Sequence, residues 1–545
     1  MSASAKVAVA HDPFQTHVGL SLLCGGDRCW TFDEYTTPKP RYGIIVSTSF
    51  SHRSRHDGAH NFAGQLRAAS RTLVALLFLF DLGNCSRAAA DEVHLAMGMR
   101  VGEVTQSSAI IWSRVTKDAT RNESGRRLIG RAGARVPKYE PLPFPVDELQ
   151  GAVPGARGEL RFTWSQDAEF REAQDSGWLA VDSENDYIRQ HQLTDLEPAT
   201  RYYVRVEARP VGAERATARI DGSFITAALS DAWQDVRFTV VTGQAYHDLD
   251  DPAGFKIYDA MLADDPQFIV PTGDTVYYDS EQPRARTIDL ARHHWHRMYS
   301  LPRLVEFHRY VPGYWEKDDH DTLSNDGWST LEPAWMLPLT WEDGLRIFRE
   351  QVPIGDEPYR TIRWGSGLQI WVVEGRDFRS PNTDPDGPDK SIWGTEQREW
   401  LQRTILESDA AFRVLISPTP IVGPDRANKQ DNHANEAFTY EGNAFRRWTQ
   451  EQGLTNFFIC CGDRHWQYMS VDPDTRLREF SCGPVCDEHA GGTPGHDMQK
   501  QPYHRVIGGY LSVAVTREDE RPTITFRFHD VSGDVTYEYR QQGER

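Results

Sequence analysis

Hydrophobic positions follow two different patterns along the chain, and the change between them falls near residue 230. From residue 91 to 230, short runs alternate hydrophobic and polar residues, as in strands with one buried face. From residue 231 onward, hydrophobic runs of strand length are separated by segments with helical spacing, which is typical of an α/β sheet. We therefore predict a β-sandwich over 91–230 and an α/β (α+β) domain over 231–545.

The individual elements follow from the same patterns. In the sandwich, the clearest predicted strands are 108–114, 158–164 and 177–181. In the α/β domain, we predict strands at 236–242, 268–272, 368–373, 412–417 and 456–461, and helices at 253–263 and 395–407. Strand patterns return at 509–515, 523–528 and 535–539, where they would complete a second sheet packed on the first.

Segment 193–206 defines the type of sandwich more closely. Its spacing L-x-x-L-x-P-x-T-x-Y-x-V-x-V is similar to the corner and following strand of fibronectin type III modules. Tyr202 stands where those modules place their corner tyrosine. We expect an Ig/fibronectin-III-like domain with a structural or shielding role.

Length and charge restrict the classes of function. A chain of 545 residues is too long for one ordinary core, so two or three domains are expected. A formal net charge of −19 argues against a nucleic-acid-binding surface, because phosphate backbones are bound by basic faces. A phosphate-containing substrate would have to be held by metal ions or a few arginines.

The first ninety residues form an N-terminal extension, of which residues 1–70 show no convincing periodicity. Its part from about 67 to 90 combines basic residues, the apolar run 71–80 and small residues, as in a secretory signal. This predicts a periplasmic or secreted protein, and the distance from Met1 suggests that the true start lies further along the chain. The alternative is a buried strand or short core helix. The apolar run is too short to span a bilayer, and no transmembrane segment is predicted.

The seven cysteines form neither a disulfide scaffold nor a zinc pattern. Cys482 and Cys486 could pair in an exported protein, whereas Cys460 and Cys461 are expected in a core strand.

Three polar clusters follow strand-like runs in the α/β domain: 273–277, 318–321 and 462–465. The carboxyl ends of strands in such a domain line the ligand crevice, so we expect the clusters to meet there. Their carboxylates, imidazoles and phenol suit a hard-cation site with room for two metals. Each cluster alone also has a simpler interpretation, such as a cap, a tight turn or a solvated acidic loop. His293, His294 and His296 fall in a helical stretch and are interpreted as surface or packing residues, and Asp279 as a loop carboxylate.

Taken together, these motifs resemble the alkaline phosphatase D (PhoD-like) branch of the calcineurin-like metallophosphoesterases, from about residue 97 onward. The residues that carry the resemblance are Gly-Asp-x-x-Tyr at 273–277, Asp-Asp-His-Asp at 318–321 and Gly-Asp-x-His at 462–465. Segments 394–401 and 374–379 agree with the family's G-x-x-Q-x-x-W-L and D-x-R-x-x-R motifs, with Glu for the first Asp. The resemblance implies a four-layer αββα domain and a hydrolase for phosphate monoesters or diesters.

The resemblance also implies a site with two metal ions, Ca²⁺ and Fe³⁺. Asp274 would bridge the metals, and Tyr277 would bind the ferric ion. The implied metal ligands are Asp274, Tyr277, Asp319, Asp463 and His465. His320 would be the general acid, and Arg376 would clamp the phosphate.

One departure concerns the iron site. The family's first strand commonly ends in Ser-Cys-Gln, but residues 242–244 read Thr-Gly-Gln, and Gly243 cannot be a ligand. His247, Asp248 or His433 could substitute, or the metal could differ. Two alternatives therefore stay open: a phosphodiesterase or phospholipase-type enzyme on lipid or wall polymers, and an inactive metal-binding member of the fold.

Overall fold

The computed structural model describes residues 92–543, and the predicted signal-like segment lies outside them. The first described part is a sandwich of two antiparallel sheets. One sheet has the order β1 (Met99–Gly102), β2 (Ala109–Arg114), β6 (Ile188–Leu193). The other has the order β4 (Gln174–Asp175), β3 (Gly158–Ser165), β7 (Arg201–Arg209), β8 (Ala218–Ile225), with β5 (Leu179–Val181) also paired to β3. The backbone N–H of Glu197 donates to the Tyr202 hydroxyl at 2.8 Å, which forms the predicted tyrosine corner.

Two larger sheets follow. The first has the order β10 (Phe268–Pro271), β9 (Val236–Val241), β18 (Tyr510–Glu518), β19 (Arg521–His529), β20 (Val535–Gln542). The second has the order β11 (Arg360–Trp364), β12 (Leu368–Val372), β13 (Phe412–Ser417), β14 (Phe457–Cys461), β16 (Arg478–Cys482), β15 (Gln467–Val471), β17 (Tyr503–Arg505). Pairing is parallel between β9 and β10, and from β12 through β13 and β14 to β16.

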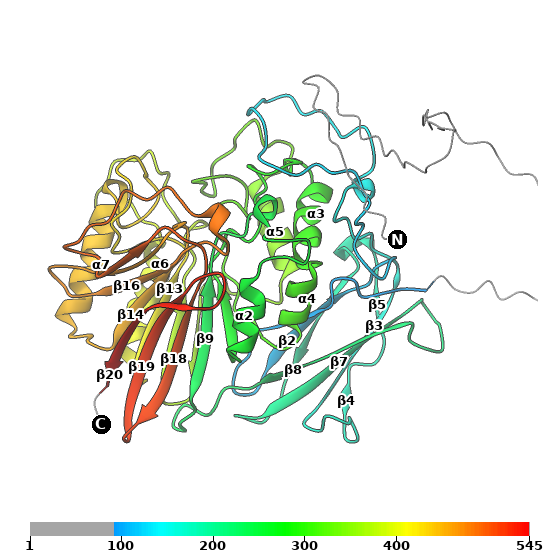
Figure 1. Cartoon of the computed structure of the whole chain (residues 1–545), viewed down its shortest axis with the longest axis horizontal. Helices are drawn as coiled ribbons and strands as arrows, with labels where there is room; N and C mark the ends of the chain where they lie inside the picture. The colour runs from blue at the N-terminus through cyan, green and yellow to red at the C-terminus, as the bar shows by residue number, and fades with distance from the viewer. Residues whose placement is uncertain (1–91, 544–545) are drawn as a thin grey trace, which may run out of the picture. The chain divides into compact units, whose positions relative to one another are not determined.

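These two sheets pack face to face, and helices cover their outer faces (Figure 1). Aromatic rings fill the space between the sheets: Phe480 of β16 stacks on Phe526 of β19 with ring centroids 3.9 Å apart. The helices next to β9 and β10 are α2 (Ile257–Ala263), α3 (Ile288–Tyr299), α4 (Pro302–His308) and α5 (Trp341–Gln351). The helices next to β13 and β14 are α6 (Gly394–Glu407) and α7 (Thr439–Glu451). The predicted four-layer αββα arrangement is therefore confirmed.

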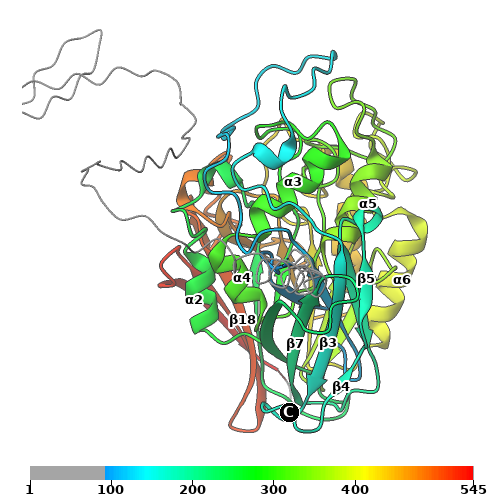
Figure 2. The same cartoon turned by 90° about the vertical axis from the view of Figure 1, so that its right-hand side faces the viewer.

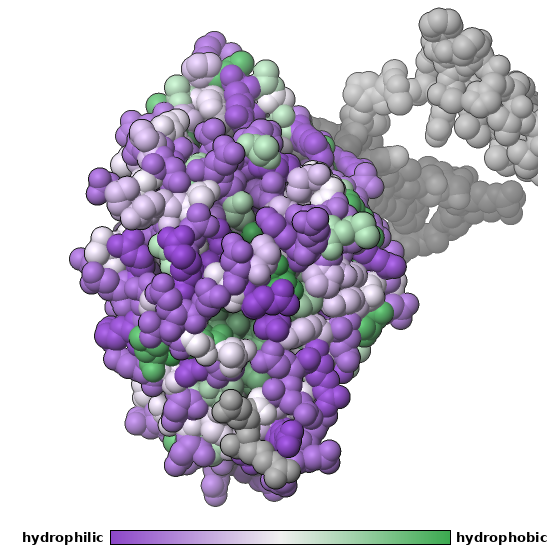
Figure 3. Space-filling model, turned by 90° about the vertical axis from the view of Figure 1, so that its left-hand side faces the viewer, coloured by the Kyte–Doolittle hydropathy of each residue, from purple (hydrophilic) through white to green (hydrophobic). Residues whose placement is uncertain are grey.

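Short 3₁₀ turns complete the described elements: η1 (Val146–Glu148), η2 (Ser183–Asn185), η3 (Tyr246–Asp248), η4 (Glu436–Phe438) and η5 (Asp487–His489). The face seen from the α6–α7 side is mainly hydrophilic, with hydrophobic residues in small groups (Figure 3). Among the described residues, no helix is long and apolar enough to cross a membrane.

A long loop between β2 and β3 extends from the sandwich onto the α/β domain near α3 (Figure 2). Arg284 donates through Nη2 to the Gly133 carbonyl at 2.8 Å, and Arg131 forms a β-bridge with Glu281. The sandwich therefore also contributes residues near the ends of the α/β strands.

Two minor expectations have clear outcomes. The three histidines of α3 are packing residues: all are buried, and His296 Nε2 lies 2.5 Å from Asp186 Oδ2 of the sandwich. Cys482 and Cys486 are free, buried thiols, so the possible disulfide between them is not formed.

Candidate functional site

The three predicted clusters converge where β10 and β14 end. Two glycines make this close approach possible. A Cβ at Gly273 would lie 2.4 Å from Asp318 Cβ, and one at Gly462 would lie 2.3 Å from Thr272 Oγ1. The next residues, Asp274 and Asp463, have φ angles of 53° and 58°. Non-glycine residues in this left-handed region carry strain of about 1–3 kcal/mol, which is often found at functional sites.

Asp274 lies at the centre of the convergence and is almost fully buried. The Tyr277 hydroxyl donates to Asp274 Oδ2 at 3.1 Å, and His465 Nε2 lies 3.8 Å from the same oxygen. Burial opposes ionisation of Asp274, but the nearby imidazoles of His320 and His465 lower its pKa overall. A negatively charged carboxylate is thus held within reach of a phenol and an imidazole.

His320 is oriented by Asp279, for which the sequence analysis found no role. His320 Nδ1 lies 2.5 Å from Asp279 Oδ1, and the Asp279 side chain is fully buried. Burial opposes a charge on the His320 imidazole, but the carboxylates of Asp279, Asp319 and Asp274 raise its pKa well above its ordinary value. The His320 imidazole is therefore held in its protonated form. Because Nδ1 faces Asp279, Nε2 is the nitrogen that remains to donate a proton.

Arg376 does not face the cleft. Its side chain is fully buried and its Nε pairs with Asp318, while Nη2 lies 3.5 Å from carboxylate oxygens of both Asp319 and Asp431. The expectation of a phosphate clamp does not fit this position, because the guanidinium is occupied by three carboxylates. In this structure Arg376 orients the acidic cluster.

Other cations line the open cleft instead: Arg131 from the sandwich loop, Arg426 and Lys429. No local sequence pattern marks these three cations, because no strand-end motif precedes them. The predicted site residues that line the same cleft are Asp274, Tyr277, His320, Asp463 and His465.

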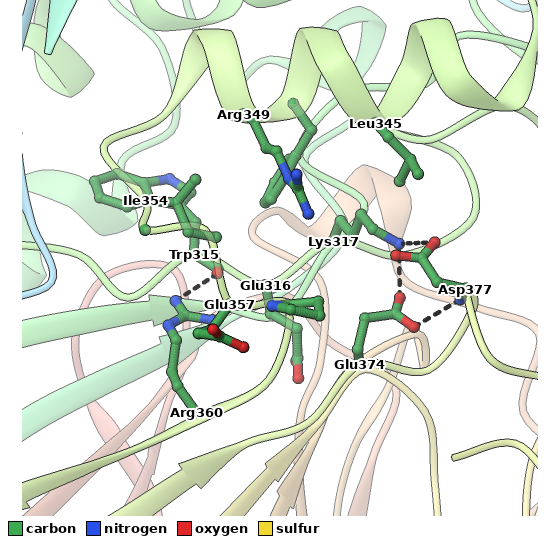
Figure 4. Close-up of a pocket in the computed structure, with 13 residues that line it drawn as sticks. Trp315, Glu316, Lys317, Leu345, Arg349, Ile354, Glu357, Arg360, Glu374 and Asp377 are labelled. Carbon is green, nitrogen blue, oxygen red and sulfur yellow. Dashed lines mark hydrogen bonds and ion pairs between the residues drawn. The ribbon is translucent and has the colours of Figure 1, made fainter. Parts of the chain in front are cut away.

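A polar network beside the cleft explains the two additional sequence motifs. Gln397 of α6 accepts from the Glu374 N–H at 2.7 Å and donates to its carbonyl at 2.8 Å, which fixes the end of β12. Lys317 Nζ bonds Glu374 Oε1 at 2.6 Å and Asp377 Oδ1 at 2.8 Å (Figure 4). The motifs at 394–401 and 374–379 thus both hold in place the segment that carries Arg376.

The residues considered as substitutes for the missing cysteine lie in different places. His433 is fully buried and its Nε2 lies 3.0 Å from Glu441 Oε2, away from the cleft lining. His247 lines the cleft, but its Nδ1 lies 2.9 Å from Glu281 Oε1. Asp248 Oδ2 lies 2.8 Å from Nδ1 of His489, a cleft residue that the sequence analysis did not identify.

The donor set fits bound cations. Ligand atoms of Asp274, Asp319 and His320 lie within 4.8 Å of one another, and those of Asp319, Asp326 and Asp431 form a second such group. Two buried carboxylate oxygens, Asp274 Oδ1 and Asp318 Oδ2, have no hydrogen-bond partner among the described residues. Unpaired buried carboxylate oxygens are costly, and a hard cation would satisfy them.

Comparisons with known proteins agree with this site. A family model described as PhoD-like phosphatase matches residues 238–542, and one described as PhoD-like phosphatase, N-terminal domain, matches residues 83–228. The chain belongs to the PhoD-like phosphatase family. This confirms the predicted family and the prediction of a phosphoric ester hydrolase of the metallophosphoesterase class.

Solved structures share the fold of this PhoD-like phosphatase. A structure of PhoD has 15% identity and a TM-score of 0.64, covering 84% of this chain and 91% of its own. A purple acid phosphatase from yellow lupin (Lupinus luteus) seeds has 10% identity and a TM-score of 0.55, covering 83% and 74%. No curated protein sequence matches the chain.

Proposed function

We propose that this PhoD-like phosphatase hydrolyses phosphate monoesters or diesters at the cleft around Asp274. The observation that carries the proposal is the buried Asp274 carboxylate at the convergence of the strand ends, whose Oδ1 has no hydrogen-bond partner within residues 92–543. Asp274, Tyr277, Asp319, Asp463 and His465 would hold the metals, with Ca²⁺ and Fe³⁺ as the proposed pair. Bound metal ions would ionise a water molecule and neutralise charge on the phosphoryl group.

The protein's own groups would serve the rest of the reaction. His320 holds a proton opposite Asp279 and would deliver it to the leaving alkoxide. Arg131, Arg426 and Lys429 line the cleft and would attract the substrate's phosphate oxygens. Arg376 is a positioning residue that holds Asp318 and Asp319.

Export to the periplasm or the medium is part of the proposal and rests on the signal-like segment at about 67–90. N-terminal sequencing of protein recovered outside the cytoplasm tests it directly. A mature chain that begins well before residue 91 would contradict this part of the proposal.

The central experiment compares the wild type with Asp274→Asn on an aryl phosphate monoester and an aryl phosphate diester, with calcium and iron supplied. We expect Asp274→Asn to lose hydrolysis and bound metal while keeping its circular dichroism spectrum. Asp251→Asn is a matched control, because Asp251 pairs with Arg303 outside the cleft lining. Equal, negligible rates for wild type and Asp274→Asn would favour an inactive metal-binding protein, and a rate confined to diesters would favour the phosphodiesterase alternative.

A further inference from the structure

We propose that His489 replaces the missing cysteine as a metal ligand, binding through Nε2 on the Tyr277 side of the centre. This inference rests on the proposed function, since it concerns the same pair of metals. It assigns to this chain an iron site, or a site for another transition metal, built from a phenol and two imidazoles.

The position of His489 matches the gap that Gly243 leaves. A Cβ at Gly243 would lie 3.4 Å from His489 Cδ2 and 3.5 Å from His465 Cδ2. A side chain at residue 243 would therefore point into the space beside both imidazoles. A Cβ at these distances would make ordinary contact with both rings, so His489 lies next to the place where a cysteine side chain at residue 243 would begin.

The distances of His489 to the proposed ligands support direct coordination. Its Nε2 lies 2.9 Å from the Tyr277 hydroxyl oxygen, and its ring centroid lies 4.2 Å from that of His465. Tyr277 in turn contacts Asp274, the proposed bridging residue. A nitrogen this close to one proposed ligand, on a ring that lies beside a second, is well placed to share their metal.

The second nitrogen of His489 is held as it is in many metal-binding histidines. Nδ1 lies 2.8 Å from Asp248 Oδ2, and metal-ligating imidazoles usually donate their other N–H to a carboxylate or carbonyl. With its N–H on Nδ1, His489 would keep Nε2, the nitrogen next to Tyr277, available for a metal. Asp248 ends η3, a few residues after Gly243, so the segment that lacks the cysteine supplies the carboxylate that orients its replacement.

His247, the nearest alternative, is less suitable. Its Nδ1 lies 2.9 Å from Glu281 Oε1 and its Nε2 lies 3.3 Å from Asp248 Oδ1, so both ring nitrogens face carboxylates. It supports Asp248 and is not a candidate for direct binding in this geometry.

The test measures metal content and colour, and does not depend on turnover. Wild type, His489→Ala and His496→Ala are loaded with iron and calcium, and the bound metals are counted by plasma mass spectrometry. His496 stacks on His504 outside the cleft lining and serves as the matched control. We expect His489→Ala to lose about one of about two bound metals, together with the visible tyrosinate-to-iron absorption, and His496→Ala to keep both.

One further variant keeps the inference falsifiable if His489→Ala fails to fold. Asp248→Asn leaves the His489 ligand in place, and we expect its iron affinity to fall by about 10- to 100-fold, as for other carboxylates that orient a metal-bound histidine. Where His489→Ala folds, Gly243→Cys in that background should restore the metal with a thiolate absorption, at the cost of some backbone strain because Gly243 has a φ angle of 63°.

The outcomes separate this inference from the proposed function. One outcome would overturn the role of His489 and leave the proposed function intact. In it, His489→Ala and Asp248→Asn keep their full iron content and colour, while Asp274→Asn loses its metal. A wild-type chain that binds neither metal would overturn the proposed function and this inference with it.

Discussion

The pairing of His320 with Asp279 makes a sharp prediction about pH dependence. The substitution Asp279→Asn keeps the shape of the side chain and removes its charge. As a general acid, His320 is active only while it is protonated. Because Asp279 raises the pKa of His320, its removal lowers that pKa, and the alkaline limb of kcat moves to lower pH.

The size of the shift follows from the geometry. His320 Nδ1 lies 2.5 Å from Asp279 Oδ1, and the carboxylate is fully buried. For charges about 4 Å apart in an effective dielectric of about 20, the interaction is about 4 kcal/mol. At 1.36 kcal/mol per pKa unit this corresponds to about 3 units. The carboxylates of Asp274 and Asp319 would be neutralised by bound metals, so Asp279 supplies most of the effect in the loaded enzyme.

The assay is the pH profile of kcat for an aryl phosphate ester, followed well above neutral pH. Asp186→Asn is the matched control, because Asp186 Oδ2 also lies 2.5 Å from a histidine nitrogen, that of His296, outside the cleft lining. We expect the alkaline limb to fall by about 2–3 pH units in Asp279→Asn and to stay in place in the control. An unchanged limb in a folded, metal-loaded Asp279→Asn protein would refute the role of His320 as general acid.

The same pair predicts the pH dependence of stability. The folded-state pKa of His320 is raised above its ordinary value of 6.5, so the pair's contribution is complete below pH 6.5. It is lost as the pH rises through the folded-state pKa, and Asp279→Asn should flatten this dependence in urea titrations.

Three further predictions concern the metals and the cations. Removing the metals with a chelator should lower the Tm. A ligand present at about 100 times its Kd stabilises the native state by about 2.7 kcal/mol. An unchanged Tm would argue against tight metal binding. Arg376→Gln leaves buried carboxylates such as Asp318 without their partner. The free energy of unfolding measured in urea should therefore fall by about 3–5 kcal/mol. A loss under about 1 kcal/mol would contradict the positioning role of Arg376. Arg426→Ala removes a cation from the cleft and should raise KM by about tenfold with a smaller change in kcat. This is the effect expected from losing a charge-assisted hydrogen bond of about 1.5 kcal/mol. An unchanged KM would exclude a contact between Arg426 and the substrate.

The parts of the structure that the sequence predicted are those with local signals. Alternating residues marked the sandwich strands, and β13 coincides with the predicted strand at 412–417. The helix predicted at 253–263 begins later, at Ile257, because Gly254 has a φ angle of 118° that a helix cannot contain. The strand-end motifs were found because Gly-Asp after a hydrophobic run leaves a local pattern.

The residues that the sequence analysis missed act across long separations. Asp279 and His320 are 41 positions apart, and His489 and Asp248 are 241 positions apart, so no local spacing connects either pair. His489 sits in a short turn after β16 with no glycine-aspartate motif, and only the approach of that turn to β9 brings it beside Gly243. In the proposed metal site, a ligand lost from one strand end is replaced by a residue far along the chain, because several strand ends meet at the same place. It follows that the loss of one motif residue is weak evidence for the loss of a metal until the neighbouring strand ends have been examined for a replacement donor.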